Sequence, residues 1–451
     1  MTKTKKRSVL ALAVAMLIAA VCAFAGCDKG GSGISPNEKY PEYASGKHMW
    51  IGGWDVPLNT EADYQMAKDM GLTHMFIDGA FARRDTEAYF DQLRHCEKVG
   101  LKAILGHDTA TNNVNGTQMS EYDYSQFAAV DMINLWDEPY ATNFADVAAR
   151  VDKAAEIYTE NPDVQLYINL SPHHEMFSGD KSNSIEEYLA AVEETVLDKI
   201  PGRRIYSTDI YPLMSRGGVN TLDAGWLRTM SIYASHAKAN NGEFHMFVQN
   251  YGDGTTRDIV SKADLTFQIN TDMAFGINGF SYFTYRQSFL GFTGGCVENN
   301  ESCKPKDSYW WAKEINSELA AWDEVYLSFD WDGVFTVQGS ENLKEDAEYQ
   351  NMHFIGLSGA LENLGCAKSV SATQDTLIGQ FKDTDGNYAL MVTNFTEPTD
   401  LLKDTVEITF NNANRALVYK NGKRTVYEVK KNKVKINLAA GEGAFVIPVK
   451  V

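Results

Sequence analysis

The sequence has few positive charges and lacks the common motifs for binding phosphate or metal. Lysine and arginine number 41 against 60 aspartate and glutamate residues, and the formal net charge is −19. Such a surface repels nucleic acids and anionic lipids, so we expect a neutral or small partner. The sequence contains no Gly-rich phosphate loop and no CxxC pair, and the side chains of His173 and His174, being adjacent, point apart on an extended segment. We therefore expect no cofactor and no metal site.

Long apolar runs are also scarce, and the one at the N-terminus, residues 8–25, lies between the basic stretch TKTKKR and the small-residue sequence FAGC. This order is typical of an export signal. It resembles the lipobox of bacterial lipoproteins, which implies that residues 1–27 are a signal peptide and that Cys27 carries the lipid. The alternative is a membrane-spanning anchor, because the run nearly reaches the ~18 to 20 residues of a span. Residues 28–46 are polar and rich in Gly, Ser and Pro, as expected of a flexible tether that holds an extracytoplasmic protein at the bacterial cell surface.

Cysteine is rare in the rest of the chain, where four residues follow Cys27. Export makes disulfide bonds chemically possible. Cys296 and Cys303 flank a short polar loop, and the sequence leaves open whether they form a disulfide. Cys96 lies within a helical pattern and Cys366 lies far downstream, so we expect both to be buried thiols.

Short apolar runs alternate with amphipathic helical windows from residue 47 to residue 331. Strands followed by helices, with almost continuous apolar character, favour a parallel sheet covered on both faces. Eight such units match a (β/α)8 TIM barrel better than a doubly wound open sheet, since no phosphate loop follows the first strand. The expected strands are 48–54, 73–79, 101–108, 131–137, 164–172, 203–212, 244–252 and 277–286, and the helical windows are 59–71, 86–100, 119–129, 143–160, 184–200, 222–240, 258–276 and 307–326.

The pattern changes in residues 332–451, where apolar and polar residues alternate between DG and NG turns. Period-two alternation with such turns predicts antiparallel strands. The segment LAAGEGAFVIPV near the C-terminus resembles the closing strands of the β-sandwich that many carbohydrate-active barrels carry. We therefore expect a C-terminal antiparallel β-sandwich domain after the barrel.

The fourth expected strand ends in the sequence WDEP, which places Trp136, Asp137 and Glu138 before a proline. In TIM barrels the chemistry lies at the carboxyl ends of the strands, where side chains leave the packed core. Glu138 is therefore a candidate general acid. Burial among aromatic rings and repulsion from Asp137 should raise its pKa and keep it protonated near neutral pH.

The chain resembles the large clan of retaining glycoside hydrolases with a (β/α)8 barrel. In that clan the acid/base glutamate follows an Asn at the end of strand four and usually precedes a Pro. Glu138 matches that glutamate, while Asp137 stands in the place of the Asn. The resemblance covers the barrel, and it implies hydrolysis of O-glycosidic bonds in an oligo- or polysaccharide substrate.

Other expected strand ends carry residue types that bind sugars. Aromatic rings stack on the apolar faces of pyranose rings, whereas carboxylates and arginine bind hydroxyl groups. For each aromatic residue taken alone, the alternative is a core position at the rim of the barrel. We expect substrate contacts from Trp54, Asp55, Asp78, Asp108, Trp136, Tyr211, Gln249, Tyr251, Tyr285 and Arg286.

The sequence departs from the clan at the end of strand seven, where the resemblance implies a nucleophilic glutamate and the chain has Gln249. Retention requires two carboxyl groups ~5 to 5.5 Å apart and inversion ~6.5 to 9.5 Å, so a second acid is needed. Asp209 at the end of strand six, or Asp253 just past strand seven, is the expected second carboxyl group.

Two further interpretations remain open. In one, Asp137 and Glu138 act as a pair, which resembles the N-acetylhexosaminidases and chitinases, where an Asp orients the acetamide of the substrate and the neighbouring Glu protonates the leaving oxygen. In the other, catalysis is lost and the barrel is a glycan-binding surface lipoprotein. The adjacent carboxylates and the missing strand-seven glutamate favour the first of these two, while the following Pro and the lack of spaced aspartates oppose it.

Overall fold

The computed structural model describes residues 38–77, 86–105, 127–158, 163–172, 184–345 and 349–451. The expected signal peptide with Cys27, most of the expected tether, and the candidate residues Asp78 and Asp108 lie outside these ranges. A search of the described ranges for a helix of sufficient length and hydropathy to span a membrane finds none.

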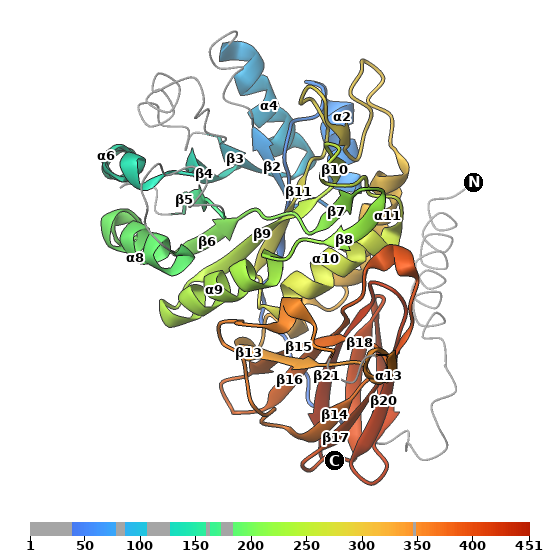
Figure 1. Cartoon of the computed structure of the whole chain (residues 1–451). Coiled ribbons are helices and arrows are strands. Elements are labelled where there is room, and N and C mark those ends of the chain that lie inside the picture. Colours follow the sequence, from blue (N-terminus) through green and yellow to red (C-terminus); the bar gives the residue numbers. More distant parts are fainter. Residues whose placement is uncertain (1–37, 78–85, 106–126, 159–162, 173–183, 346–348) are drawn as a thin grey trace, which may run out of the picture.

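Within the described residues, eight parallel strands close into a barrel, drawn in the upper part of Figure 1. Each strand pairs with the next one along the chain, and the last returns to pair with the first. The expected TIM barrel is confirmed, and the open-sheet alternative is wrong. The barrel strands are β1 (Trp50–Gly53), β2 (His74–Ile77), β3 (Lys102–Leu105), β4 (Val130–Asp137), β5 (Gln165–Leu170), β6 (Ile205–Thr208), β9 (Glu243–Gln249) and β11 (Gly279–Phe283).

Helices between the strands cover the outside of the barrel. Side-chain caps begin two of them: the Thr60 side chain accepts a hydrogen bond from the Asp63 backbone nitrogen, and Ser184 does the same for Glu187. The helices are α2 (Glu61–Asp69), α4 (Thr86–Val99), α6 (Phe144–Ile157), α8 (Ile185–Thr195), α9 (Trp226–Ala239), α10 (Lys262–Ala274), α11 (Asp307–Ala320) and the short α12 (Asp323–Tyr326), with 3-10 turns at Ala141–Asn143 and Leu197–Lys199.

The interior of the barrel is a small apolar cluster that is separate from the larger core under the helices. Because side chains of a strand alternate between two faces, one set fills the barrel and the other set packs against the helices. Three half-buried rings, Trp54, Tyr211 and Phe283, lie on this cluster. The interior cluster consists of Trp50, Phe76, Ile104, Met132, Tyr167, Ile205 and Phe247.

Two short strand pairs extend from the carboxyl ends of the barrel strands. One is the hairpin of β7 (Leu213–Arg216) and β8 (Val219–Leu222), and the other pairs β10 (Tyr251–Gly252) with β12 (Thr293–Gly294). Both lie in the loops that follow β6, β9 and β11, and they build up the rim of the barrel mouth.

The C-terminal region forms two antiparallel sheets with an apolar layer between them, in agreement with the expected sandwich. The larger sheet has the order β13-β15-β16-β21-β18-β19 and the smaller one the order β14-β17-β20. The strands are β13 (Asp330–Val337), β14 (Ala367–Ser371), β15 (Thr376–Lys382), β16 (Tyr388–Asn394), β17 (Asp404–Phe410), β18 (Arg415–Lys420), β19 (Lys423–Glu428), β20 (Lys433–Leu438) and β21 (Gly443–Val449), with the short helix α13 (Ser340–Glu345) and 3-10 turns at Met352–Phe354 and Pro398–Asp400.

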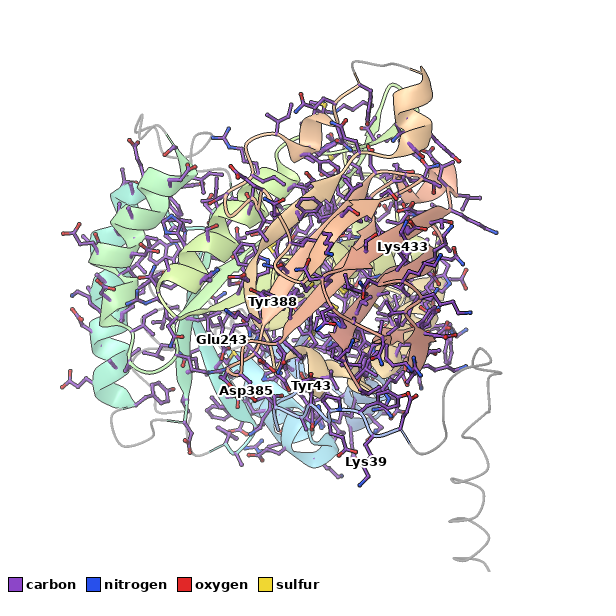
Figure 2. All side chains as sticks on the ribbon, turned by 90° about the horizontal axis from the view of Figure 1, so that it is seen from below. Lys39, Tyr43, Glu243, Asp385, Tyr388 and Lys433 are labelled. Carbon is purple, nitrogen blue, oxygen red and sulfur yellow. The ribbon has the colours of Figure 1, made fainter. Side chains whose placement is uncertain are left out.

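The larger sheet packs directly on the barrel helices. The Trp331 indole nitrogen donates to the Ala274 carbonyl oxygen at 2.9 Å, at the end of α10. A Cβ on Gly379 would lie 2.2 Å from that same oxygen, so only glycine permits this close approach. Figure 2 looks onto this end of the molecule, where Glu243 at the start of β9 is labelled with Asp385 and Tyr388 of the sandwich region. The carboxyl ends of the barrel strands therefore face away from the sandwich.

Candidate active site

The end of β4 is bent so that two carboxyl groups leave the strand together. The pairing of β4 with β5 shifts register between Asn134 and Asp137, and Glu138 adopts a left-handed backbone conformation with φ of 47°. The Glu138 backbone nitrogen still donates to the Asn169 carbonyl oxygen at 2.8 Å, which fixes this bend against β5. A bulge of this kind re-aims side chains at the end of a strand. Asp137 and Glu138 are both partly buried.

Asn169 of β5 joins two of the carboxyl groups. Its side-chain nitrogen donates to Asp137 Oδ1 at 3.0 Å and to Asp209 Oδ1 at 2.8 Å. Since both bonds start at one nitrogen atom, the two carboxylate oxygens lie less than about 6 Å apart. The structure thus brings together Asp137, Glu138 and Asp209, three residues that the sequence places on strands four and six.

Burial and mutual repulsion dominate the electrostatics of these three groups. Burial, followed by the charge of Asp137, raises the pKa of Glu138 to about 7. Burial and the charges of Glu138 and Asp137 hold the pKa of Asp209 well above its usual value, although hydrogen bonds from Asn169 and Tyr211 oppose this shift. The pKa of Asp137 is also raised by burial, against the hydrogen bond from Asn169. Among the described residues, no lysine or arginine offsets the charge on Glu138.

Aromatic rings run from the barrel interior to the rim beside these carboxyl groups. Tyr211 and Tyr251 meet edge to face at 4.9 Å between ring centroids, and each also contacts Phe283. The chain of contacts continues outward to Phe289 at 5.5 Å from Phe283. Trp54 contacts Phe283 from the other side, at 6.3 Å. Trp54, Tyr211 and Tyr251 therefore occupy the mouth, where the sequence predicts substrate contacts.

Two expected substrate contacts, Trp136 and Tyr285, instead pack outside the barrel. The guanidinium of Arg150 on α6 lies 4.1 Å from the centre of the Trp136 ring, and Trp136 belongs to the core under the helices. The register shift before Asp137 turns Trp136 to this side, because one inserted residue reverses the alternation of faces. Tyr285 follows the end of β11, is fully buried in the same outer core, and has a hydroxyl group without a partner among the described residues.

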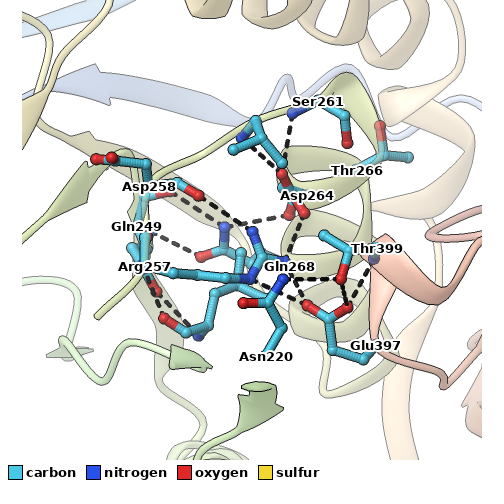
Figure 3. A network of polar contacts seen from close by, with 12 residues as sticks. Asn220, Gln249, Arg257, Asp258, Ser261, Asp264, Thr266, Gln268, Glu397 and Thr399 are labelled. Atoms are coloured by element: carbon cyan, nitrogen blue, oxygen red, sulfur yellow. Dashed lines mark hydrogen bonds and ion pairs between the residues drawn. The ribbon is translucent and has the colours of Figure 1, made fainter. Parts of the chain in front are cut away.

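Gln249 is also not placed to contact a substrate, which corrects another expectation. It is fully buried at the end of β9, and its side-chain oxygen accepts a bond from the Leu213 backbone nitrogen. Its side-chain nitrogen donates to the carbonyl oxygens of Leu213, Tyr251 and Arg257. These bonds use the oxygen and both protons of the amide, so Gln249 joins the loops after β6 and β9 to each other (Figure 3).

Asp253, the alternative second carboxyl group, caps an exposed turn. Its Oδ1 accepts bonds from the backbone nitrogens of Thr255 and Thr256 and from the Thr256 hydroxyl. These bonds lower the pKa of Asp253 although burial opposes them. Asp253 therefore acts as a turn residue in this structure, and of the two expected second carboxyl groups only Asp209 has its pKa raised by Glu138.

The remaining candidates stand at the edge of the mouth or lie outside the described residues. Asp55 follows β1 and accepts a bond from the Ser288 backbone nitrogen at 2.9 Å, which ties the first and last strand ends together. Arg286 is half-buried near Cys303, where burial raises the pKa of the thiol and the charge of Arg286 opposes this rise. No contact between Arg286 and Glu138 is present. Asp78 and Asp108 lie outside the described residues.

Cys296 and Cys303 are free buried thiols, as are Cys96 and Cys366. The disulfide that the sequence leaves open is therefore not formed in this structure. The Cys296 sulfur accepts a hydrogen bond from the Asn250 side chain at 3.1 Å, and burial raises its pKa to about 12. Cys296 is a packing residue of the loop after β11.

Sequence reasoning missed the polar residues that lie below the carboxyl groups inside the barrel. Asn169, Ser207, His245 and Ser281 are buried and occupy inward positions of β5, β6, β9 and β11. A signal for them exists in the sequence, because each is a polar residue within a largely apolar run. Their contacts with one another become evident only when the strands are side by side.

A cavity of about 700 Å³ lies at the opposite end of the barrel, against the sandwich, with Trp50, Trp331 and Phe381 in its wall. Several charges around it already form pairs, such as Arg203 with Glu243 and Lys238 with Asp332. It contains no converging carboxyl groups, so the chemistry is better placed at the mouth. A search of the described residues finds no group of three or more metal-ligating side chains suited to an ion.

Comparison with known proteins gives a likeness of fold. No family model matches the chain, and no curated protein matches it. Among solved structures, a catalytic mutant of Gan42B, a GH42 beta-galactosidase from G. stearothermophilus, aligns with a TM-score of 0.52 at 9% identity over 89% of this chain and 98% of that chain. A provisionally assigned alpha-galactosidase from Bacteroides fragilis aligns with a TM-score of 0.50 at 13% identity over 90% and 80%. In both cases the alignment spans the barrel and extends into the C-terminal sheets.

Proposed function

We propose that this chain is a glycoside hydrolase that cleaves O-glycosidic bonds in an oligo- or polysaccharide, with Glu138 as the general acid/base. The observation that carries the proposal is the convergence of Asp137, Glu138 and Asp209 at the mouth of the barrel. Two carboxyl groups across a scissile bond are the minimum that this chemistry needs. The fold neighbours named above, a beta-galactosidase and a provisionally assigned alpha-galactosidase, agree with the proposal.

In the proposed reaction Glu138 first donates its proton to the leaving oxygen. A pKa of about 7 suits this role, because the group can then release and recover a proton near neutral pH. Asp209 attacks the anomeric carbon and forms a glycosyl ester. Asn169 and Tyr211 favour its ionised form, and the positive charge that develops on the sugar favours it further. Water then cleaves the ester while Glu138 takes up a proton.

The walls of the mouth suit a sugar more than a charged ligand. The half-buried rings of Trp54 and Tyr211 lie at the mouth, and Tyr211 bonds Asp209. Aromatic faces pack on the apolar side of a pyranose, whereas hydroxyls and carboxylates bind its rim. The net charge of −19 also disfavours anionic substrates.

The substrate-assisted mechanism is the second candidate. It is favoured by one observation, the position of Asp137 directly beside Glu138, with Asp137 held by Asn169 at 3.0 Å. Here Asp137 would orient the acetamide of an N-acetylated sugar, and no glycosyl ester would form on Asp209. A thiazoline inhibitor that mimics the cyclic intermediate distinguishes the two, since it binds tightly only in the substrate-assisted case.

The experiment for the proposed function is hydrolysis of a panel of aryl glycosides and polysaccharides by the mature protein. Glu138→Gln should lower turnover by about 100-fold or more, the usual size of a general-acid effect. Glu156→Gln, at an exposed position of α6, is the matched control and should leave turnover unchanged. If the wild-type protein binds glycans but cleaves none of the panel, the chain is a glycan-binding protein and the proposal is wrong.

We also propose that the protein is attached to the outer side of a bacterial membrane by a lipid on Cys27. The basic stretch, the apolar run and the sequence FAGC support this. Incorporation of labelled palmitate into the wild-type protein, and its loss in Cys27→Ser, is the expected result. A protein that carries no label, or carries it equally in both forms, would refute the anchor.

A further inference from the structure

A chain of hydrogen bonds runs through the barrel interior to the carboxyl groups of the proposed active site. Ser281 Oγ lies 3.0 Å from His245 Nε2, and His245 Nδ1 lies 2.9 Å from Ser207 Oγ. Ser207 Oγ donates to Asn169 Oδ1 at 2.8 Å. Asn169 then donates to Asp137 and Asp209. Four strands contribute to this chain, and every member below the aspartates is buried.

The direction of each bond is determined by its neighbours. The Asn169 nitrogen donates to both aspartates, so its oxygen must accept from Ser207. Ser207 has one proton, which this bond uses, so its oxygen can only accept from His245 Nδ1. The proton of a neutral His245 therefore lies on Nδ1, and Nε2 accepts from Ser281.

The environment of His245 agrees with that assignment. Burial, with a smaller contribution from His74, holds the pKa of His245 well below its usual value, so the ring stays neutral. Trp50 stacks on the imidazole at 4.0 Å with planes 8° apart, which prevents the ring from turning. A neutral ring in a fixed orientation provides one donor and one acceptor, as the chain of bonds requires.

At the other end of this chain of hydrogen bonds, Gly52 leaves space for Ser281. A Cβ on Gly52 of β1 would lie 2.2 Å from Ser281 Oγ, so the glycine makes room for that hydroxyl. The hydroxyl in turn donates to His245 Nε2, and the imidazole would otherwise have an unpaired acceptor in the apolar interior. Ser281 and Gly52 thus support the orientation of Asn169 indirectly, through His245 and Ser207.

We propose that Asn169 is a positioning residue of the active site, whose amide is locked by Ser207, His245 and Ser281 so that it holds Asp137 and Asp209 in place and favours their ionised forms. This inference rests on the proposed function. A rotated amide would point its oxygen at the oxygens of both aspartates, where its nitrogen now donates. At its other end the rotated amide would point an N–H group at the Ser207 hydroxyl, whose proton now bonds Asn169, so Ser207, His245 and Ser281 favour the orientation that donates to both aspartates.

Two substitutions at Asn169 separate positioning from mere packing. Asn169→Asp keeps the shape but replaces the donor with an acceptor, and Asn169→Ala removes both. If Asn169 only fills space, both variants should lose stability while kcat and the pH profile of the folded protein stay as in the wild type. Under the proposal both lower kcat by about 100-fold with a much smaller change in KM. Both also move the acidic limb of kcat/KM to higher pH, because Asp209 loses a bond that lowers its pKa.

A matched control and a second position complete the kinetic test. Ser308→Ala removes a buried hydroxyl that bonds the Gly295 carbonyl under α11, and it should change stability without moving the pH profile. Ser207→Ala should move the profile in the same direction as Asn169→Ala, by a smaller amount. An unchanged profile in Asn169→Asp, or an equal shift in Ser308→Ala, would overturn the inference.

A readout without turnover keeps this test separate from the proposed function. Nitrogen-15 labelling of the nine histidines gives the tautomer of each ring by NMR. We expect His245 to be neutral with its proton on Nδ1 between about pH 5 and pH 8. In Ser207→Ala the ring should no longer be confined to this tautomer. Carbon-13 labelling of aspartate should show two carboxyl groups that titrate at higher pH in Asn169→Ala.

A proton on Nε2, or unchanged aspartate titration, refutes the positioning role even if the enzyme cleaves glycosides. The expected spectra in a protein without glycosidase activity would refute the proposed function alone.

Discussion

The side-chain nitrogen of Gln249 donates to the carbonyl oxygen of Arg257 at 2.8 Å, in a network that continues from the barrel into the sandwich (Figure 3). The Arg257 side chain is buried and pairs with Asp264 of α10 and with Glu397 of the sandwich. The strand end that carries the nucleophile in the resembled clan thus has a structural role here. Under the proposed function, the carboxyl groups that remain for catalysis are those at the end of β4 and that of Asp209, which directly follows β6.

Gln249→Glu should destabilise the protein and should not raise its activity. A carboxylate would place an oxygen against the carbonyl oxygens of Leu213, Tyr251 and Arg257, where the amide now donates. We expect a loss of at least about 3 kcal/mol in the free energy of unfolding, measured by urea denaturation. Gln65→Glu, on the exposed face of α2, should cost no more than about 0.5 kcal/mol. A stable and more active Gln249→Glu variant would show that this strand end can serve catalysis.

Glu397→Ala should weaken the junction between barrel and sandwich. It leaves the buried Arg257 guanidinium with only Asp264 as a charged partner, and breaking a buried pair costs about 3 to 5 kcal/mol. Glu407→Ala removes a more exposed carboxylate that pairs with Lys433, and should cost much less. Urea denaturation of both variants measures the difference. Equal losses would mean that the buried network does not stabilise the junction.

The stability of the protein should depend on pH through Glu138. Its pKa is about 7 in the folded protein and 4.5 ordinarily, so the folded state holds the proton more tightly. Stability contributed by this group is present below about pH 4.5 and is lost as pH rises to about 7, by up to about 3 kcal/mol. Glu138→Gln should therefore melt a few degrees above the wild type at pH ~8 and equally at pH ~4. A difference that is the same at both pH values contradicts the raised pKa.

Two tryptophans should separate binding from packing. Trp54→Ala removes a ring at the mouth and should raise KM by about 10-fold, equal to about 1.4 kcal/mol, with little change in kcat. Trp136→Ala removes a ring that packs under Arg150 and should lower the melting temperature while KM stays unchanged. Steady-state kinetics and thermal melting of both variants give the comparison. The reverse pattern would place the substrate on the other side of β4.

The barrel was predictable because its strands are buried on both faces. Runs such as those of β4 and β5 are almost continuously apolar, and amphipathic helices separate them, which is the pattern of a parallel sheet under helices. The position of Glu138 at the end of the fourth strand followed from the count of strands alone. The alternation in the C-terminal region likewise indicated antiparallel sheets.

The face of Trp136 was not predictable, because a bulge leaves no clear mark in the sequence. With regular alternation from Met132 and Asn134, Trp136 would point into the barrel, and the register shift before Asp137 reverses it. The role of Gln249 was hidden for a different reason. Its partners lie on loops that only the folded chain brings around it. Asn169 depends in the same way on neighbouring strands.

The most direct test of the central claim is the dependence of Glu138→Gln on the leaving group. A general acid matters when the leaving oxygen needs a proton, and matters little for dinitrophenolate, which leaves without one. We predict that Glu138→Gln lowers kcat/KM by about 100-fold or more on an unactivated oligosaccharide and only slightly on the matching dinitrophenyl glycoside. Equal losses on both substrates, or no loss on either, would contradict the assignment of Glu138 as the acid.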